Sequence, residues 1–239
     1  MAPKQDYSLP QSNDVFGKQL LEFKQLEGHD RDSVPTVFHL LVGYFQDKPE
    51  HLKSVGLFRV AVDLQLVTEL EVHIAMGDYS FIQTIKDPNV VSNYFKILMR
   101  NMSDPICPFS LYDRFLSLSS VDKEARVTPL KGLVRLLPKI NFNTLKFIVA
   151  FCITVVAQEE HNKMSHYNIA VTVGPNIFRP KELSPADFVN AGTFYDIFIR
   201  FMENFDEIFG GYNVYDPSAL RQTGAGDQML AMCMDESQN

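Results

Sequence analysis

A single arginine, Arg59, stands in an otherwise apolar stretch, Gly-Leu-Phe-Arg-Val at residues 56–60. Leu57 and Phe58 can anchor this stretch in a hydrophobic core. Their charged neighbour cannot follow them, because burying an unpaired charge is too costly. Arg59 is therefore expected to be paired, solvated or directed at something outside the domain. For the stretch alone, an ordinary ion pair or a solvated loop arginine is the simplest interpretation, since short isolated motifs are weak signals.

Two further cations, Lys96 and Arg100, stand four residues apart. On a helix, side chains at this spacing share one face, and like charges there repel each other by about a few tenths of a kcal/mol. Tyr94, Leu98 and Met102 mark the neighbouring apolar side of the same predicted helix. Two interpretations of the pair stay open: a solvated helix face, or a surface that receives anionic groups of a partner.

A third group of polar residues runs from Asn162 to Asn176. Asn162 and Ser165 stand where they can cap helices, and Gly-Pro-Asn at residues 174–176 is typical of a turn. Asn168 falls inside a predicted short helix, where asparagine has a poor propensity. Its side chain is therefore either exposed or recruited for a specific hydrogen bond.

The composition limits the chemistry that these residues can serve. The 239 residues are 46% hydrophobic and include 19 Phe, which is enough for a sizeable core. A net charge of −7 argues against nucleic-acid binding, which needs a basic face. The six His match no metal-ligand spacing, and no Gly-x-Ser-x-Gly nucleophile motif occurs. We expect no metal site, no cofactor and no nucleic-acid partner.

Cysteine usage and the apolar segments indicate the compartment. Three widely spaced cysteines without a Cys-x-x-Cys pair are typical of reduced thiols in a cytosolic protein. The N-terminus lacks the apolar region of a secretory signal, and the longest apolar run, Phe147–Ala157, is too short to cross a bilayer. We expect a soluble, cytoplasmic monomer with no intrinsic membrane anchor, which reaches membranes only if its partner recruits it.

Apolar residues recur at helical spacing, and no alternating strand pattern or fixed repeat is found. The sequence therefore predicts an all-α fold, a single compact domain of roughly eight or nine helices over residues 15–211. Residues 1–14 are expected to be a disordered lead, and residues 212–239 a flexible tail.

Capping residues and helix breakers predict where the helices begin and end. A buried stripe on the second predicted helix includes Leu64, and one on the last includes Phe188. The expected limits are caps at Ser33, Asp63, Asp87, Ser165 and Ser184, a helix from Val121 to Leu137 that is kinked or interrupted around Pro129, a long apolar helix capped by Asn141 or Asn143, a short helix Tyr167–Val173 broken at Gly174-Pro175, and a last helix running to Gly210-Gly211.

Taken together, the three polar groups resemble the GTPase-activating domains of Rho-type small GTPases, the RhoGAP domain family. The family pattern is a Gly-[Ile/Leu]-Phe-Arg loop, a helix with Lys and Arg four apart before an acidic-Pro turn, then Asn-Lys-Met, Asn-[Leu/Ile]-Ala and Gly-Pro-Asn. The resemblance covers roughly residues 15–210. Each motif is weak alone, but five in this order are specific. In this sequence they are Gly56–Arg59, Lys96 and Arg100 before Asp104-Pro105, Asn162–Met164, Asn168–Ala170 and Gly174–Asn176.

The resemblance implies a role for each matching residue. Arg59 corresponds to an arginine finger inserted into the active site of a GTP-bound Rho-family GTPase, which itself holds GTP and Mg²⁺. Lys96, Arg100 and Asn168 correspond to residues that support the finger loop and contact the GTPase. Structural roles are implied for the remaining motif residues: Gly56, Phe58, Asn162, Pro175 and Asn176.

Two departures from the family pattern bear on rate and partner choice. Ala61-Val62 follows where the family usually has Ser-Gly, and Asn101 stands where a glutamate is usual. The resemblance implies no catalytic activity without a GTPase. The alternative to a GTPase activator is a catalytically silent domain of this fold that binds a GTPase or another signalling protein as a scaffold.

Overall fold

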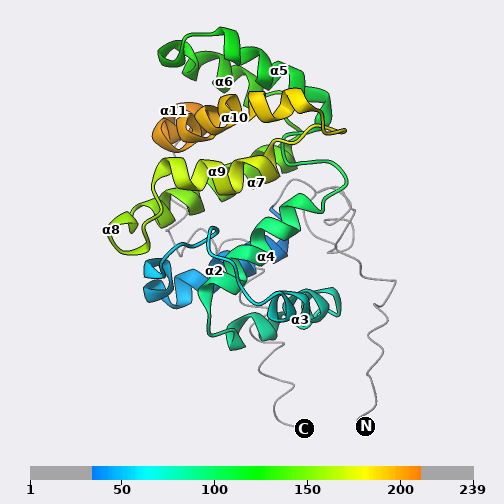
Figure 1. The fold of residues 1–239 in the computed structure, drawn as a ribbon, viewed down its shortest axis with the longest axis vertical. Helices are drawn as coiled ribbons and strands as arrows, with labels where there is room; N and C mark the ends of the chain where they lie inside the picture. Colours follow the sequence, from blue (N-terminus) through cyan, green and yellow to red (C-terminus); the bar gives the residue numbers. More distant parts are fainter. Residues whose placement is uncertain (1–33, 211–239) are drawn as a thin grey trace.

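The computed structural model describes residues 34–210 (Figure 1), and within that range every regular element is a helix. The all-α prediction is confirmed. The predicted lead, tail and Ser33 cap lie outside the described residues. The α-helices are α2 (Thr36–Asp47), α3 (Leu64–Ala75), α4 (Pro88–Arg100), α5 (Tyr112–Leu116), α6 (Val127–Val134), α7 (Lys139–Val156), α8 (Glu159–Asn162), α9 (His166–Ile177), α10 (Pro185–Glu203) and α11 (Phe205–Phe209).

Five short 3-10 helices join these elements. They are η1 (Pro49–Lys53), η2 (Tyr79–Thr84), η3 (Phe109–Leu111), η4 (Ser117–Ser120) and η5 (Lys123–Ala125). Because the structure contains several such short helices, it divides the chain more finely than the eight or nine helices expected.

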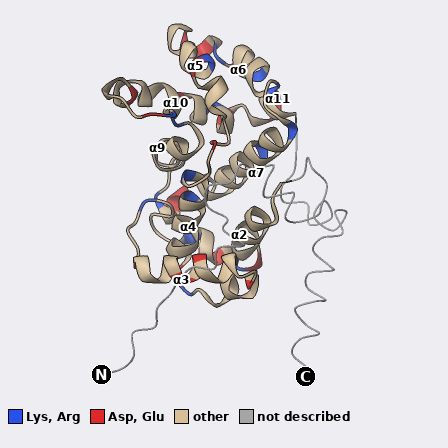
Figure 2. Cartoon of the chain, turned by 90° about the vertical axis from the view of Figure 1, so that its right-hand side faces the viewer, with Lys and Arg blue, Asp and Glu red and all other residues tan. Residues whose placement is uncertain are grey.

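The helices form two groups on either side of α7 and α9 (Figure 1). Helix α9 packs against α4 on one side and against α10 on the other. The α4 side also holds α2 and α3, and the α10 side holds α5, α6 and α11. Figure 2 shows that Lys and Arg residues, like Asp and Glu residues, are spread over both groups of helices.

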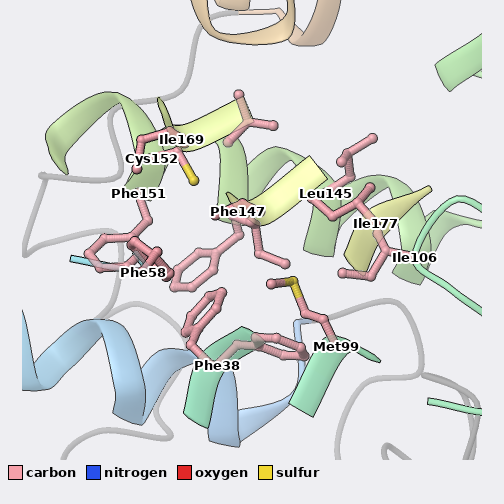
Figure 3. Packing of buried hydrophobic residues seen from close by; sticks show 14 of the residues in the cluster. Phe38, Phe58, Met99, Ile106, Leu145, Phe147, Phe151, Cys152, Ile169 and Ile177 are labelled. Carbon is pink, nitrogen blue, oxygen red and sulfur yellow. The ribbon is translucent and has the colours of Figure 1, made fainter. Parts of the chain in front are cut away.

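The core on the α4 side is rich in aromatic rings. Phe58, between η1 and α3, is fully buried and lies edge-on to Phe95 and to Phe151, each at a centroid distance of 6.1 Å. Figure 3 shows Phe58 beside Phe151 in this cluster, above Phe38. Aromatic pairs of this kind contribute about 0.5–1.5 kcal/mol beyond their buried area. Residues directly before Arg59 are therefore fixed to the centre of the domain.

Helix α7 is the central helix that the sequence predicts, and it is the one described helix long and apolar enough by composition to cross a membrane. Most of its side chains are instead buried inside the protein. It begins at Lys139, directly after Pro138, and not at Asn141 or Asn143 as expected. The Asn141 amide lies within the first turn and donates to the Ile106 carbonyl at 3.0 Å. Proline's fixed φ already suits a helix entry, so an asparagine cap is not needed there.

The predicted helix from Val121 to Leu137 is wrong in its start, and α6 is not interrupted at Pro129. Helix α6 begins only at Val127, which places Pro129 third in the helix. The first N–H groups of a helix have no intrahelical acceptor, so a proline there removes no hydrogen bond. The last predicted helix is also divided, because α10 ends at Glu203 and a separate short helix, α11, precedes Gly210.

Helix α9 does not break at Gly174-Pro175 but continues to Ile177 with Pro175 inside it. A proline inside a helix withdraws its own N–H and crowds the carbonyl four residues earlier, so the last turn needs other support. The side-chain amide of Asn176 donates to the carbonyls of Thr172 and Val173, at 2.9 and 3.3 Å. The Gly-Pro-Asn motif is therefore the end of a helix, stabilised by its own asparagine, and not a turn.

Two apolar residues predicted in buried stripes are exposed. Leu64 is 70% exposed and Phe188 is 78% exposed. Both lie in the first turn of a helix, α3 and α10 respectively. The predicted caps of the described helices fit better. Side chains of Asp63, Asp87 and Ser165 each accept a backbone N–H, and Ser184 forms a capping box with Asp187.

Candidate functional site

Arg59 lies in the loop between η1 and α3, and its side chain is exposed. Leu57 and Phe58, immediately before it, are both 0% exposed. The guanidinium has no hydrogen-bond or ion-pair partner within residues 34–210. The apolar stretch is thus anchored as the sequence predicts, and its charge is left facing solvent.

The backbone of this loop is held in two left-handed conformations. Gly56 has φ +74° and Phe58 has φ +66°. A Cβ on Gly56 would lie 2.3 Å from Cγ2 of Val60, so only glycine fits. For a bulky residue such as Phe58, this region costs about 1–3 kcal/mol and persists where surrounding contacts fix it. The loop is thus a strained turn that the rest of the domain must hold.

The turn is closed by backbone hydrogen bonds and tied to the end of α8. The carbonyl of Gly56 accepts from the N–H groups of Arg59 and Val60, at 2.8 and 2.9 Å. The N–H of Gly56 donates in turn to the carbonyl of Asn162 at 2.7 Å. This last bond joins two motifs that are more than a hundred residues apart in the sequence.

Helix α4 holds the other side of the loop. Lys96 donates from its ammonium group to the Phe58 carbonyl. The Ser92 hydroxyl accepts from the Phe58 N–H at 3.0 Å. The Asn93 amide donates to the Val60 carbonyl at 3.0 Å. The backbone on both sides of Arg59 is therefore bonded to one helix.

The structure separates Lys96 from Arg100, although they share a helix face. Lys96 is half-buried against the loop, and its pKa is lowered by that burial and, to a smaller extent, by the charge of Arg100. Arg100, the last residue of α4, is exposed and has no ion-pair partner among the described residues. Of the two cations, Arg100 is the one whose charge is available to another molecule.

Asn162 is a buried connector. Its side-chain amide donates to the carbonyls of Leu52 and Val155, at 2.9 and 2.7 Å, and its side-chain oxygen accepts from the Met164 N–H at 2.8 Å. The side chain is 0% exposed. The left-handed Lys163, with φ +61°, follows it. These contacts support a structural role, since they link η1, α7 and the segment after α8.

Asn168 lies in the first turn of α9 and is half-buried. Its amide donates to the carbonyl of Lys163 at 3.1 Å, the residue after Asn162. Asn168 is thus next to the segment that supports Gly56, and its side chain makes no hydrogen bond to Arg59. Pro175 and Asn176 lie at the other end of α9, where Asn176 is nearly buried, and their contacts are within the helix.

Exposed apolar side chains occur close to Arg59 in the chain. Val55 and Val60, within the loop, are 59% and 41% exposed, and Leu64 at the start of α3 is 70% exposed. Tyr167, beside Asn168, is 60% exposed. Exposed apolar groups that gather near charges are typical of protein-binding surfaces.

Residues 34–210 offer no metal site and no reactive thiol. They contain no group of three or more His, Cys, Asp or Glu that could hold a metal ion. Cys107 and Cys152 are free and buried, and burial raises the pKa of both thiols well above the usual value. Buried neutral thiols are poor nucleophiles. The chemistry available to this site is therefore that of a solvent-facing guanidinium.

Ser92 and Asn93 were not among the residues singled out in the sequence. Both follow Val90 and Val91 within an amphipathic helix, and Ser92 is 0% exposed. A polar pair on the inner side of an amphipathic helix is the signal that could have drawn attention to them, because buried polar groups need partners.

The family of this chain follows from comparison with known domains. A model of the RhoGAP domain matches residues 33–182, more than half of the chain. The chain belongs to the RhoGAP domain family, and the resemblance of its motifs is confirmed.

Relatives and solved structures agree with this assignment. Rho GTPase-activating protein 24 of Mus musculus is 32% identical over 180 residues, which cover 74% of this chain and 24% of that protein. Rho GTPase-activating protein 1 of Homo sapiens is 28% identical over 176 residues, covering 72% and 39%. The crystal structure of human Rho GTPase activating protein 15 matches with a TM-score of 0.72 at 21% identity, over 88% of this chain and 100% of that one. The last match shows the fold alone. The chain spans about a quarter of the length of the first relative.

Proposed function

We propose that this domain activates GTP hydrolysis by a Rho-family small GTPase and that Arg59 is its arginine finger. The observation that supports the proposal best is a contrast within three residues. Leu57 and Phe58 are fully buried, while the Arg59 guanidinium is exposed and has no partner in the described part of the chain. The loop backbone is held in place by the domain, and the guanidinium that it carries makes no ion pair or hydrogen bond within the described residues.

A free guanidinium at such a position suits phosphoryl transfer. Hydrolysis of GTP spreads negative charge over the transferring phosphoryl group, and an arginine supplied in trans accelerates it about a thousandfold to a hundred-thousandfold. Arginine is always charged and presents a planar fork of donors, whereas lysine offers a point charge. The domain needs no cofactor of its own for this, since GTP and Mg²⁺ are held by the GTPase.

The other residues have supporting tasks in this proposal. Lys96 fixes the loop through the Phe58 carbonyl. Arg100 and the exposed apolar groups near Arg59 face the GTP-bound partner, and Asn168 supports the segment at Lys163. We further propose that the domain acts as a cytoplasmic monomer and that its partner brings it to membranes. Alone it catalyses nothing.

The second candidate is a silent module that binds a GTPase or another signalling protein without accelerating hydrolysis. Ala61, two residues after Arg59, is exposed, and Val62 is half-buried. Ala61-Val62 stands where the family usually has Ser-Gly, so the link from the loop to the Asp63 cap of α3 differs in sequence from the family pattern. The retained, unpartnered Arg59 favours the active alternative, because a binding module has less need of it.

Single-turnover GTP hydrolysis separates the two candidates. A panel of Rho-type GTPases loaded with GTP is measured with no addition, with this protein and with its Arg59→Ala variant. We expect acceleration of at least one GTPase by the wild type and loss of about a thousandfold or more of that acceleration in the variant.

Arg114→Ala is the matched control, because Arg114 is an exposed arginine of α5 on the far side of the molecule from α4. We expect this variant to retain full acceleration. If the wild type accelerates no GTPase, the catalytic proposal fails and the silent module is left. If Arg59→Ala accelerates as well as the wild type, activation stands but Arg59 is not its source.

A further inference from the structure

We propose that Ser92 and Asn93 of α4 are positioning residues for Arg59, which act by fixing the peptide groups on either side of it. This inference rests on the proposed role of Arg59. Ser92 contacts the residue before the finger, and Asn93 contacts the residue after it. Together with Lys96, they make α4 the template on which the finger loop is set.

Ser92 holds the strained residue Phe58. Its hydroxyl accepts from the Phe58 N–H at 3.0 Å and donates to the Asn89 carbonyl at 3.0 Å. The hydroxyl thus accepts one hydrogen bond and donates another in a site where Ser92 is 0% exposed. Removing the hydroxyl would leave a buried N–H without an acceptor in a residue whose φ is +66°. Since the left-handed conformation persists only when its surroundings fix it, this bond bears directly on the direction of the finger.

Asn93 holds the other side. Its amide donates to the Val60 carbonyl at 3.0 Å and to the Asn89 carbonyl at 2.9 Å. Two carbonyl acceptors fix which end of the amide faces them, because only the nitrogen can donate. The amide thereby joins the loop to α4 one residue after Arg59.

The two bonds matter because the Arg59 side chain has no hydrogen-bond or ion-pair partner within residues 34–210. The direction of its side chain therefore depends on the backbone from Phe58 to Val60. That backbone is bonded internally at Gly56 and externally at Ser92, Asn93 and Lys96. A catalytic group displaced by about 1 Å can lose about a hundredfold in rate. Removing one of several hydrogen bonds that hold the loop should lower the rate less, by about tenfold.

Asn93→Asp is the sharpest variant, because aspartate has the same shape but its carboxylate cannot donate to either carbonyl. Asn93 is half-buried, so the fold tolerates the change better than one at Ser92. Asn204→Asp is the matched control, since the Asn204 amide donates to the carbonyl of Arg200 four residues earlier, at 3.3 Å, and lies at the end of α10. Ser92→Ala is the companion variant.

Two measurements test the inference. In single-turnover hydrolysis with a GTPase that the wild type accelerates, we expect Asn93→Asp to lower the maximal rate about tenfold and to change the half-saturating concentration less than twofold. In the Arg59→Ala background the same substitution should have no further effect. Amide hydrogen exchange of the free protein should speed up about tenfold at Arg59 and Val60 in Asn93→Asp, and at Phe58 in Ser92→Ala. Asn204→Asp should change neither measurement.

An unchanged rate and unchanged exchange in Asn93→Asp would overturn the inference. So would an equal loss of rate in the Arg59→Ala background, because Asn93 would then act independently of the finger. If the wild type accelerates no GTPase but exchange changes as expected, the proposed function fails while the positioning of the loop by α4 stands. Unchanged exchange in that case overturns both.

Discussion

Two arginines of this domain are used in opposite ways. Arg126, just before α6, is only 6% exposed and forms an ion pair with Asp196 of α10 at 2.7 Å. It also donates to the carbonyls of Val121 and Ser119, at 2.9 and 3.3 Å. Arg59 is exposed and has no such partner in the described range. The Arg126 guanidinium is bonded inside the protein, and the Arg59 guanidinium faces solvent.

The comparison shows how an arginine that stabilises the fold differs from one that is left to solvent. The backbone is well fixed in both regions, so rigidity alone does not tell them apart. The difference is in the donors: those of Arg126 are matched by internal acceptors, whereas those of Arg59 can be satisfied only by solvent or by another molecule. Substitutions at the two sites should therefore affect different measurements.

The largest effect is expected from Arg59→Lys. The charge is kept, but the planar fork of donors is lost. We expect the acceleration of GTP hydrolysis to fall about a thousandfold, which corresponds to about 4 kcal/mol of transition-state stabilisation. Thermal and urea unfolding should be unchanged to within about 0.5 kcal/mol, as for other surface substitutions. A stability loss comparable to the rate loss would erase the contrast with Arg126.

The reverse result is expected for Arg126→Ala. Removing Arg126 leaves the largely buried Asp196 carboxylate to the more distant guanidinium of Arg200, at 4.0 Å, and a buried charge that loses its main partner costs about 3 kcal/mol or more. Urea unfolding measures the loss directly. Replacing both partners, in Arg126→Met with Asp196→Leu, should recover much of the stability, because a well-packed apolar pair can replace a buried ion pair. No recovery in the double variant would argue against uncompensated charge as the cause.

Asn162→Ala should lower both the stability of the domain and its acceleration of GTP hydrolysis. The variant removes three buried hydrogen bonds that connect η1, α7 and Met164. Leaving buried groups without partners costs about 1–3 kcal/mol. Because the Asn162 carbonyl also accepts from Gly56, we expect a loss of stability of about 2 kcal/mol in urea unfolding and a smaller loss of acceleration. Full stability together with lost acceleration would instead assign Asn162 to the interface.

The smallest effect is expected at an exposed ion pair. Arg200 and Glu203 of α10 lie 3.3 Å apart, and the Glu203 side chain is 42% exposed. Such pairs contribute about 0–1 kcal/mol, since solvent screens them. Glu203→Ala should therefore change stability by less than about 0.5 kcal/mol, with acceleration unchanged. A larger loss of stability would show that a partly exposed ion pair can stabilise this domain, and that exposure alone does not separate its arginines into structural and solvent-facing ones.

Much of this arrangement could be predicted from the sequence. Helical spacing and capping residues were sufficient for the all-α fold and for the starts of α3, α4 and α10. The exposure of Arg59 followed from the cost of burying a charge beside Leu57 and Phe58. These inferences depend on local chemistry, which the sequence contains.

What could not be predicted depends on contacts between distant segments. The bond from Gly56 to Asn162 and those from the loop to Ser92 and Asn93 exist only in the folded chain. Pro175 was expected to end a helix because local propensity says so, yet α9 continues through it to the buried Ile177. Leu64 and Phe188 fit an apolar stripe in the sequence, but their side chains are exposed in the structure.

The affinity of the domain for a GTPase in its transition state tests the central claim most directly. A Rho-type GTPase carrying GDP and aluminium fluoride mimics the transferring phosphoryl group, and titration calorimetry can compare it with the GTP-bound form. We predict that wild type binds the mimic at least about a hundredfold more tightly than Arg59→Ala does, since transition-state analogues gain most from groups that act in the transition state. Both proteins should bind the GTP-bound form within about threefold of each other. Equal affinity of the two proteins for the mimic would contradict the account, because Arg59 would then make no contact that the transition state requires.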